Sequence, residues 1–234
     1  ASGSKIGNDI IYGTTSINKI QTYGGNDSVY AGTGSDKVYL GAGNDYVRVG
    51  GGTESFFGGD GKDYISYYNS TNGVRLDLAT NAASRSWASN DTISGFESAS
   101  GSRTGADKLY GTSGSNTFKS YGGDDKLYGR SGNDKLYGGD GEDRFDGGHG
   151  ADLLYGGDDA DVFHFDRGEG DDVIKDFENN VDIIELDNFG LSKSQAYALA
   201  SNVGSDVVFD FGTDGSLTIE NATRNQILND FDVV

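Results

Sequence analysis

The sequence predicts an all-β fold, a parallel β-roll solenoid in which nine-residue units coil upon one another, closed by a β-rich C-terminal cap. Two observations predict it: a nine-residue repeat in strict register, and 39 Gly among 234 residues, well above ordinary usage. Collagen is excluded because the chain has no Pro and no three-residue period. Disorder is disfavoured because aromatic residues make up 12% of the chain.

The first block of repeats covers residues 13–66 and contains six units. In each unit the sixth residue is acidic or an amide and the eighth is apolar. The sixth positions are Asn18, Asp27, Asp36, Asp45, Glu54 and Asp63, and the eighth are Ile20, Val29, Val38, Val47, Phe56 and Ile65.

The second block covers residues 102–164 and contains seven units with the same pattern. Its sixth positions are Asp107, Asn116, Asp125, Asp134, Asp143, Asp152 and Asp161, and its eighth are Leu109, Phe118, Leu127, Leu136, Phe145, Leu154 and Phe163. Asp172 fits one further unit that is displaced by two residues, and Asp9 fits a partial unit ahead of the first block.

The best-formed units are Gly58-Gly-Asp-Gly-Lys-Asp-Tyr-Ile-Ser66 and Gly138-Gly-Asp-Gly-Glu-Asp-Arg-Phe-Asp146. Their pattern resembles the RTX family, the hemolysin-type calcium-binding repeat proteins, over about half of the chain. The resemblance implies calcium binding, export through a bacterial type I secretion apparatus without a signal peptide, and an extracellular location. It also implies that the acidic tail Asn229-Asp-Phe-Asp-Val-Val234 is part of a secretion signal.

Elementary chemistry explains why these residues stand at this spacing. Glycine-rich turns reach positive φ without steric cost, and the last three residues of each unit form a short strand with its middle residue inward. Two units make one 18-residue coil, so each unit stacks on the second unit after it. Stacked turns offer carboxylates and backbone carbonyls, the oxygen ligands that calcium accepts in irregular cages more readily than magnesium.

We therefore expect roughly 7–10 calcium ions between stacked turns. The pairs expected to meet are 18/36, 27/45, 36/54 and 45/63 in the first block, and 107/125, 116/134, 125/143, 134/152 and 143/161 in the second. Sites with Asn18 or Asn116 should be weaker because an amide carries no charge. The candidate metal ligands are Asp27, Asp36, Asp45, Glu54, Asp63, Asp107, Asn116, Asp125, Asp134, Asp143, Asp152, Asp161 and Asp172.

The organisation expected is a roll over residues 1–175 and a capping and secretion-signal segment over residues 176–234. Residues 67–101 lose the nine-residue period but keep strand-like pieces, so we interpret them as an insertion within the roll. In the cap, strands are expected at 182–186, 206–211 and 217–219, with a short helix capped by Ser192 at 192–200. Phe231 and Val233 suit a last strand equally well as a secretion signal.

The composition disfavours several function classes. Lys and Arg total 18 against 37 Asp and Glu, a net charge of −19 that opposes nucleic-acid binding. The absence of Cys excludes thiolate zinc and redox sites, and no apolar run is long enough to cross a membrane. His149 and His164 occupy ordinary repeat positions without a nucleophile arrangement, so we expect no enzyme activity in this segment.

Three functions fit the sequence. The chain could be the folding and secretion module of a larger exported protein, a binder of acidic polysaccharide or a cell surface, or a self-contained secreted calcium-binding protein. The second draws on expected outward columns of Lys108, Lys126 and Arg144 beside Tyr110 and Tyr128. On the opposite face the expected neighbours are Tyr137, Tyr155, Lys119 and Lys135. Nine calcium ions would nearly neutralise the chain's net charge of −19.

Overall fold

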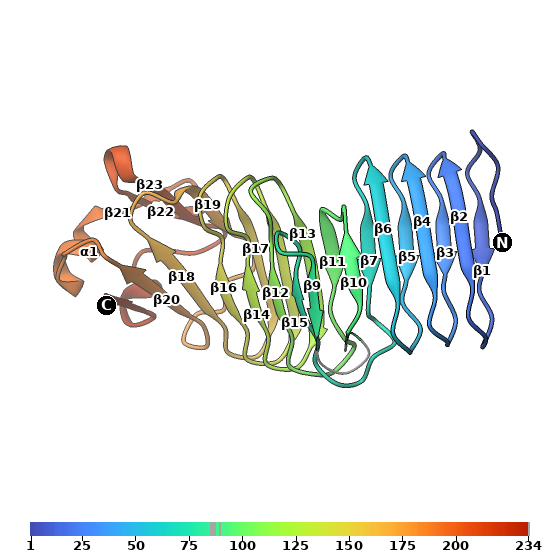
Figure 1. Ribbon diagram of the computed structural model, residues 1–234. Helices are drawn as coiled ribbons and strands as arrows, with labels where there is room; N and C mark the ends of the chain where they lie inside the picture. The colour runs from blue at the N-terminus through green and yellow to red at the C-terminus, as the bar shows by residue number, and fades with distance from the viewer. Residues whose placement is uncertain (85–87, 89, 234) are drawn as a thin grey trace.

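The computed structural model is a long roll of stacked coils, with the N-terminus at one end and the C-terminus at the other (Figure 1). The structure describes residues 1–84, 88 and 90–233, so residues 85–87 and 89 of the predicted insertion, and residue 234, lie outside the described residues. Within the repeat blocks successive strands alternate between two sheets, each with twelve strands in the described chain. The predicted all-β parallel β-roll is confirmed.

The first sheet begins with β1 and contains every second strand of each repeat block. In spatial order its strands are β1 (Ile10–Tyr12), β3 (Ser28–Tyr30), β5 (Tyr46–Arg48), β7 (Tyr64–Ser66), β11 (Ser98–Ser100), β13 (Thr117–Gly122), β15 (Lys135–Asp140), β17 (Leu153–Asp158), β19 (Gly170–Ile174), β23 (Gly215–Ile219), β22 (Asp206–Asp210) and β21 (Ala200–Val203).

The second sheet begins with β2 and carries the alternate strands. In spatial order they are β2 (Lys19–Gly24), β4 (Lys37–Ala42), β6 (Ser55–Asp60), β10 (Thr92–Ser94), β9 (Ala82–Ser84), β8 (Arg75–Asp77), β12 (Lys108–Tyr110), β14 (Lys126–Tyr128), β16 (Arg144–Asp146), β18 (Val162–Asp166), β20 (Ile183–Asp187) and β24 (Phe231–Val233).

Within each repeat block the strands pair in parallel with an offset of 18 residues. Val29 of β3 lies beside Val47 of β5, which lies beside Ile65 of β7. The offset follows from two nine-residue units per coil, so equivalent positions of every second unit stack directly.

Strands of six residues alternate with strands of three, which differs from the uniform three-residue strands expected. In β2, β4 and β6 the pairing continues past the apolar position, because Tyr23 pairs with Gly41 and Gly41 with Gly59. These longer strands carry the extended conformation through the first position of the next unit, whose side chain then also points inward. In the first block the first position of a unit therefore adds inward side chains to those of the eighth.

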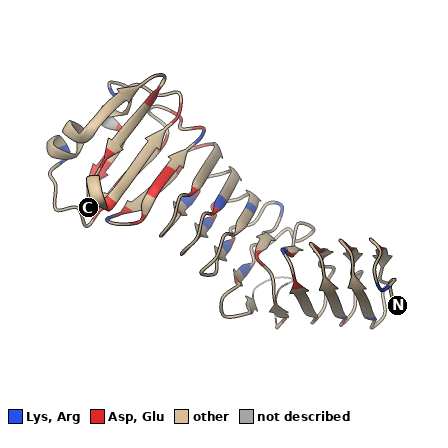
Figure 2. Ribbon diagram, turned by 90° about the horizontal axis from the view of Figure 1, so that it is seen from above, with Lys and Arg blue, Asp and Glu red and all other residues tan. Residues whose placement is uncertain are grey.

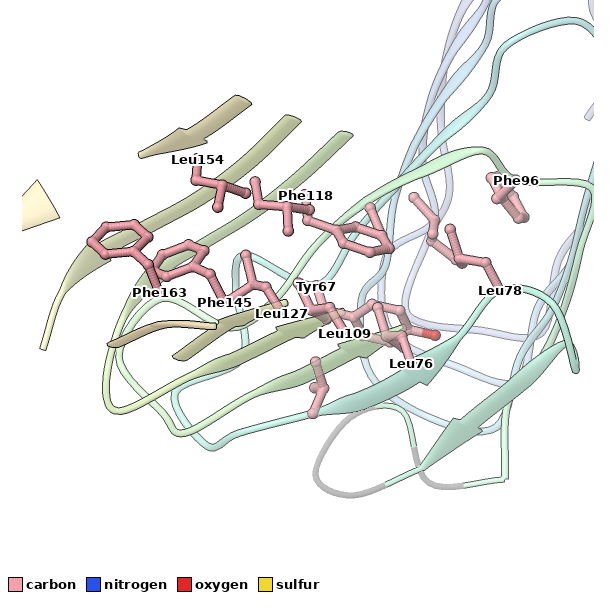
Figure 3. Packing of buried hydrophobic residues seen from close by; sticks show 14 of the residues in the cluster. Tyr67, Leu76, Leu78, Phe96, Leu109, Phe118, Leu127, Phe145, Leu154 and Phe163 are labelled. Carbon is pink, nitrogen blue, oxygen red and sulfur yellow. The ribbon is translucent and has the colours of Figure 1, made fainter. Parts of the chain in front are cut away.

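The core is a double row of side chains between the two sheets. Figure 3 shows Phe118 and Leu154 of the first sheet across from Leu109, Leu127 and Phe145 of the second. All of these side chains are buried. Burial of each stabilises the fold by roughly 1.5–3 kcal/mol relative to an exposed position. First positions add four buried side chains to this core in the first block, namely Thr22, Ala31, Leu40 and Val49.

Glycine is required where consecutive turns stack. In the turn of residues 138–143, Gly139 and Gly141 have φ of +123° and +119°. A Cβ atom on Gly141 would lie 2.6 Å from the carbonyl oxygen of Gly123 one coil earlier, closer than non-bonded atoms allow. The turns therefore stack backbone against backbone, with their carbonyl groups facing the neighbouring coil.

Residues 67–101 continue both sheets despite losing the repeat. β10 pairs in parallel with β6, and β11 joins β7 to β13, so the first sheet crosses this segment without a break. In the second sheet β8, β9 and β10 form antiparallel pairs. The side chains of Val74, Leu76, Leu78, Ile93 and Phe96 are buried in the core.

The C-terminal segment closes the end of the roll. Helix α1 (Lys193–Leu199) begins at Ser192, which forms a capping box with Gln195. β21, β22 and β23 form an antiparallel extension of the first sheet, and β24 pairs with β20 at the edge of the second. Phe209 and Phe231 are fully buried. Two short 3₁₀ helices complete the segment, η2 (Gly212–Asp214) and η3 (Ile227–Asn229).

Candidate metal sites

The sixth residue of each unit lies directly before a strand and touches its equivalent one coil away. The backbone N–H of Asp27 donates to Oδ1 of Asp45 at 2.7 Å, and the N–H of Asp45 donates to Oδ1 of Asp63 at 2.8 Å. The same hydrogen bond joins 18/36, 107/125, 116/134, 125/143, 134/152 and 143/161. Asp36 and Glu54 lie in the same register through the N–H of Ser55, which donates to the carbonyl oxygen of Asp36. The stacking expected from the repeat is therefore present.

These contacts line up as two acidic ladders, one at the start of each sheet's strands. The first ladder contains Asp9, Asp27, Asp45, Asp63, Glu97, Asn116, Asp134, Asp152 and Asp172. The second ladder contains Asn18, Asp36, Glu54 and Asp91, followed after β9 and β8 by Asp107, Asp125, Asp143, Asp161 and Asp182. Asp172 and Asp9 thus stand where the displaced and partial units were expected.

Ten of the thirteen candidate ligands keep a buried carboxylate oxygen for which the described residues offer no hydrogen-bond donor. They are Asp27, Asp36, Asp45, Glu54, Asp63, Asp125, Asp134, Asp143, Asp152 and Asp161. A buried polar atom without a partner costs about 1–3 kcal/mol, and more when it is charged. Such atoms in a regular row indicate sites for a positively charged ligand.

The other three candidates, Asp107, Asn116 and Asp172, keep no buried side-chain oxygen without a donor. Asp107 accepts from the backbone N–H of Ser102 and of Val74, so both of its oxygens have donors. The side-chain oxygen of Asn116 accepts from the N–H of Thr112 in its own turn at 2.7 Å. Asp172 accepts from the N–H of Asp152 at 2.9 Å. Asp107 and Asn116 therefore lack the free oxygen that the other positions offer.

A glycine at the first position of a unit leaves space beside the free oxygen. A Cβ atom on Gly138 would lie within 2.7 Å of both Oδ2 of Asp143 and the carbonyl oxygen of Gly156 in the next coil. At Gly129 the equivalent atoms, Oδ2 of Asp134 and the carbonyl oxygen of Gly147, would lie within 2.4 Å. A carboxylate oxygen and a backbone carbonyl oxygen thus converge on one space between consecutive turns.

Burial changes the acid–base chemistry of these carboxyl groups. Loss of solvent raises the pKa of Asp125 to about 6, of Asp134 and Asp161 to about 7, and of Asp143 and Asp172 to about 8. Neighbouring ladder carboxylates add to the rise, for example Asp125 and Asp161 acting on Asp143. Without a cation, the ladders therefore oppose ionisation at neutral pH.

The donor set defines what the sites can hold. Within the described residues no group of three or more Asp, Glu, His or Cys side chains surrounds a common point. Each space combines at most two carboxylates with backbone carbonyl oxygens, an all-oxygen set that fits calcium better than softer metals. The residues present therefore fit calcium.

Three ladder members were missed from the sequence, namely Asp91, Glu97 and Asp182. Each is followed two residues later by a buried apolar side chain, respectively Ile93, Ala99 and Ile184. Full repeats show this same arrangement, an acidic residue and then an inward residue two positions on. A search for this three-residue pattern, without the nine-residue spacing, would have identified all three.

The chain was compared with families of known proteins and with solved structures. The sequence profile of the RTX calcium-binding nonapeptide repeat (four copies) matches residues 5–38, 30–65, 103–136, 128–163 and 137–174. Among solved structures, the extracellular lipase LipA from Serratia marcescens is similar, with 18% identity and a TM-score of 0.48. That match covers 99% of this chain and 39% of the lipase chain.

No curated protein matches the sequence. In the described part of the chain, no helix is both long and apolar enough to cross a membrane. The profile matches cover both repeat blocks, and the stacked turns supply the oxygen ligands that such repeats require. The chain therefore belongs to the RTX calcium-binding nonapeptide repeat family.

Proposed function

We propose that this chain is an extracellular calcium-binding module that folds when calcium binds, after export through a type I secretion apparatus. The observation that supports the proposal best is the regular row of buried carboxylate oxygens without hydrogen-bond donors. A row of buried, uncompensated acids opposes folding. A bound divalent cation makes the contribution of the same row to the free energy of folding favourable.

The proposed calcium ligands are the acidic side chains of the ladders together with carbonyl oxygens of the glycine-rich turns. Roughly 7–10 ions fit the number of stacked turn pairs. Asp27, Asp36, Asp45, Glu54, Asp63, Asp125, Asp134, Asp143, Asp152 and Asp161 are the stronger candidates because each retains a free oxygen. Bound calcium supplies positive charge there, while the chain's own residues orient the oxygens and exclude water.

Export and folding are coupled in this proposal. A cytosol low in calcium leaves the ladders repelling one another, so the chain stays extended and can pass through a narrow channel. Outside the cell, calcium completes the roll over residues 1–175, and residues 176–234 cap its end. The same tail serves as secretion signal before folding, and Phe231, buried beside β20, becomes part of the cap afterwards. In this proposal the segment itself has no catalytic role.

Circular dichroism during a calcium titration tests the proposal. The calcium-free chain at pH 7.5 is expected to give a disordered spectrum, and added calcium a β spectrum in a cooperative transition. Magnesium at the same concentrations is the control, because it demands a stricter octahedron and should induce little structure. A complete β spectrum in excess chelator contradicts the proposal.

A second candidate function is calcium-dependent binding of acidic polysaccharide or of a cell surface. Tyr110 and Tyr128 stack at 4.7 Å between ring centroids, and Tyr137 and Tyr155 stack at 4.4 Å. The Nζ of Lys119 lies 5.5 Å from the centre of the Tyr137 ring. Figure 2 shows Lys and Arg on strands in the middle of the roll. Aromatic rings stack on sugars and cations hold carboxylates, so these columns suit such a ligand.

A glycan array with and without calcium separates the two functions. Binding that requires calcium and is lost in Tyr137→Ala favours the polysaccharide binder, whereas no binding under either condition favours the folding module alone. The third alternative, a self-contained secreted calcium-binding protein, is distinguished by the length of the full gene product.

A further inference from the structure

The first repeat block ends beside a segment that has no repeat, yet the stacking of turns continues there. β10 pairs with β6 so that Phe57 lies beside Ser94, and β11 pairs with β7 so that Tyr64 lies beside Ser98. Residues 95–97 consequently lie over the turn of residues 58–63. A three-residue corner stands where a repeat would place a six-residue turn.

Glu97 occupies the place of a sixth-position aspartate in this corner. The backbone N–H of Asp63 donates to Oε2 of Glu97 at 2.8 Å, the same bond that joins Asp45 N–H to Asp63 Oδ1. The glutamate side chain is one methylene longer than aspartate, which compensates for the shorter corner. Glu97 thus extends the first ladder through the insertion.

The corner also supplies the carbonyl oxygen that a repeat turn would supply. A Cβ atom on Gly58 would lie within 2.5 Å of both Oδ2 of Asp63 and the carbonyl oxygen of Gly95. This is the arrangement found at Gly138, where Asp143 and the carbonyl of Gly156 border the equivalent space.

No positively charged group of the described residues offsets the carboxylate of Asp63. Asp63 is 1% exposed, and its Oδ2 has no hydrogen-bond donor among the described residues. None of the ion pairs between described side chains includes Asp63 or Glu97. Two carboxylates and a backbone carbonyl therefore face one another without a positive partner.

The side of Glu97 that faces Asn116 offers no cation site. There the side-chain amide of Asn116 donates to the carbonyl oxygen of Glu97 at 2.7 Å, and the N–H of Asn116 donates to Oδ1 of Asp134. An N–H donor fills the position that a cation would take, so only the side facing Asp63 offers a site.

We propose that Asp63, the carbonyl of Gly95 and Glu97 form a calcium site outside the consensus repeats, built half from the repeat block and half from the insertion. The site rests on the proposed function, because it requires that the ladders bind calcium. Its ion joins the last coil of the first block to the insertion, and the Glu97–Asn116 bond continues that connection to the second block. Calcium bound there couples the folding of the two blocks.

Calcium counting on the whole chain tests the site. Glu97→Gln keeps an acceptor for Asp63 N–H but removes the charge, so equilibrium dialysis with calcium-45 is expected to give one ion fewer per chain than wild type. Glu142→Gln is the matched control, because Glu142 is exposed and lies beside Asp143 without being a ladder member. It should bind the wild-type number.

Limited proteolysis within residues 67–101 provides the second readout. Glu97→Gln is expected to need a higher calcium concentration for protection of this segment than wild type or Glu142→Gln. A Glu97→Gln chain with the wild-type calcium number and the wild-type protection overturns the site. If wild type binds no calcium at all, the proposed function fails instead, so the two failures are distinct.

Glu97→Asp keeps the experiment decisive if Glu97→Gln does not fold at any calcium concentration. The aspartate restores the charge with a shorter reach, so it is expected to fold and to bind the wild-type number of ions with one weakened site. A Glu97→Asp chain that folds at the same calcium concentration as wild type overturns the site, because the site requires the longer reach of the glutamate as well as its charge.

Discussion

Replacement of Asp143 by Asn should destabilise the fold when calcium is present and stabilise it when calcium is absent. Asp143 Oδ1 accepts the N–H of Asp125 at 2.8 Å, and its own N–H donates to Asp161 at 2.9 Å, so it borders two spaces between turns. Asn preserves an acceptor for Asp125 while removing the charge that both spaces share. The variant therefore separates calcium binding from turn capping.

The magnitude follows from linkage. An ion that binds only the folded chain stabilises it by about 2.7 kcal/mol when its concentration is a hundred times its dissociation constant. Loss of two neighbouring ions at that concentration lowers the free energy of unfolding by up to about 5 kcal/mol. Without calcium the effect reverses, because burial raises the pKa of Asp143 to about 8 and an amide has no charge to desolvate.

Urea denaturation followed by circular dichroism measures both effects. It is run in saturating calcium, and in calcium-free buffer at pH 7.5 with sucrose added so that the calcium-free chain folds. Glu142→Gln is the control and should behave as wild type in both. Equal destabilisation of Asp143→Asn with and without calcium would show that Asp143 is a turn cap only and not a calcium ligand.

Three further outcomes follow from the same geometry. Gly138→Ala should lose calcium and about 1–3 kcal/mol of stability, because its Cβ would overlap Asp143 Oδ2. Gly114→Ala, whose Cβ would meet nothing closer than 3.9 Å, should change stability by less than about 0.5 kcal/mol in the same urea assay. In calcium-free buffer with the same sucrose, the melting temperature should fall from pH 5 to pH 8. Protonation of the buried carboxyl groups gives its full stabilisation below their pKa of 3.8 in the unfolded chain. This stabilisation is lost as pH rises through their pKa values in the folded chain, about 6 for Asp125 and about 8 for Asp143. A melting temperature that rises over this range would contradict the pKa shifts. Calcium binding at pH 7 to the chain already folded in sucrose should release protons, because the buried carboxyl groups are then partly protonated. The release is seen as a calorimetric heat that varies with the ionisation enthalpy of the buffer, and a buffer-independent heat would count against it.

The architecture of the roll was accessible from sequence because one physical period governs it. Stacking of equivalent positions follows directly from two nine-residue units per coil, and Val29, Val47 and Ile65 lie where that arithmetic places them. The helix N-cap at Ser192 was accessible for a similar reason, since its signal is local.

Features that depend on contacts between coils were not accessible. The inward direction of Leu40 depends on the six-residue strand β4, whose length is fixed by pairing with neighbouring coils rather than by the unit itself. Saturation of Asp107 by Ser102 and Val74 likewise depends on how the insertion packs. Sequence spacing alone could not distinguish Asp107 from Asp125.

The acidic ladders continue beyond the repeat blocks because a ladder position needs only three consecutive residues in the right pattern, whereas a full repeat needs nine. An acidic residue followed two positions later by an inward apolar residue suffices to begin a strand in register, as at Asp91 and Glu97. The glycines of the full unit serve the close approach of consecutive turns and are dispensable where the turn is replaced.

Anomalous diffraction at a long X-ray wavelength, from crystals grown in calcium, tests most directly whether cations occupy the spaces beside the ladder carboxylates. Peaks are expected between consecutive turns beside Oδ2 of Asp134, Asp143 and Asp152, and one between Asp63 and Glu97. Ordered turns with the same carboxylate positions and no anomalous peaks beside them would contradict the account.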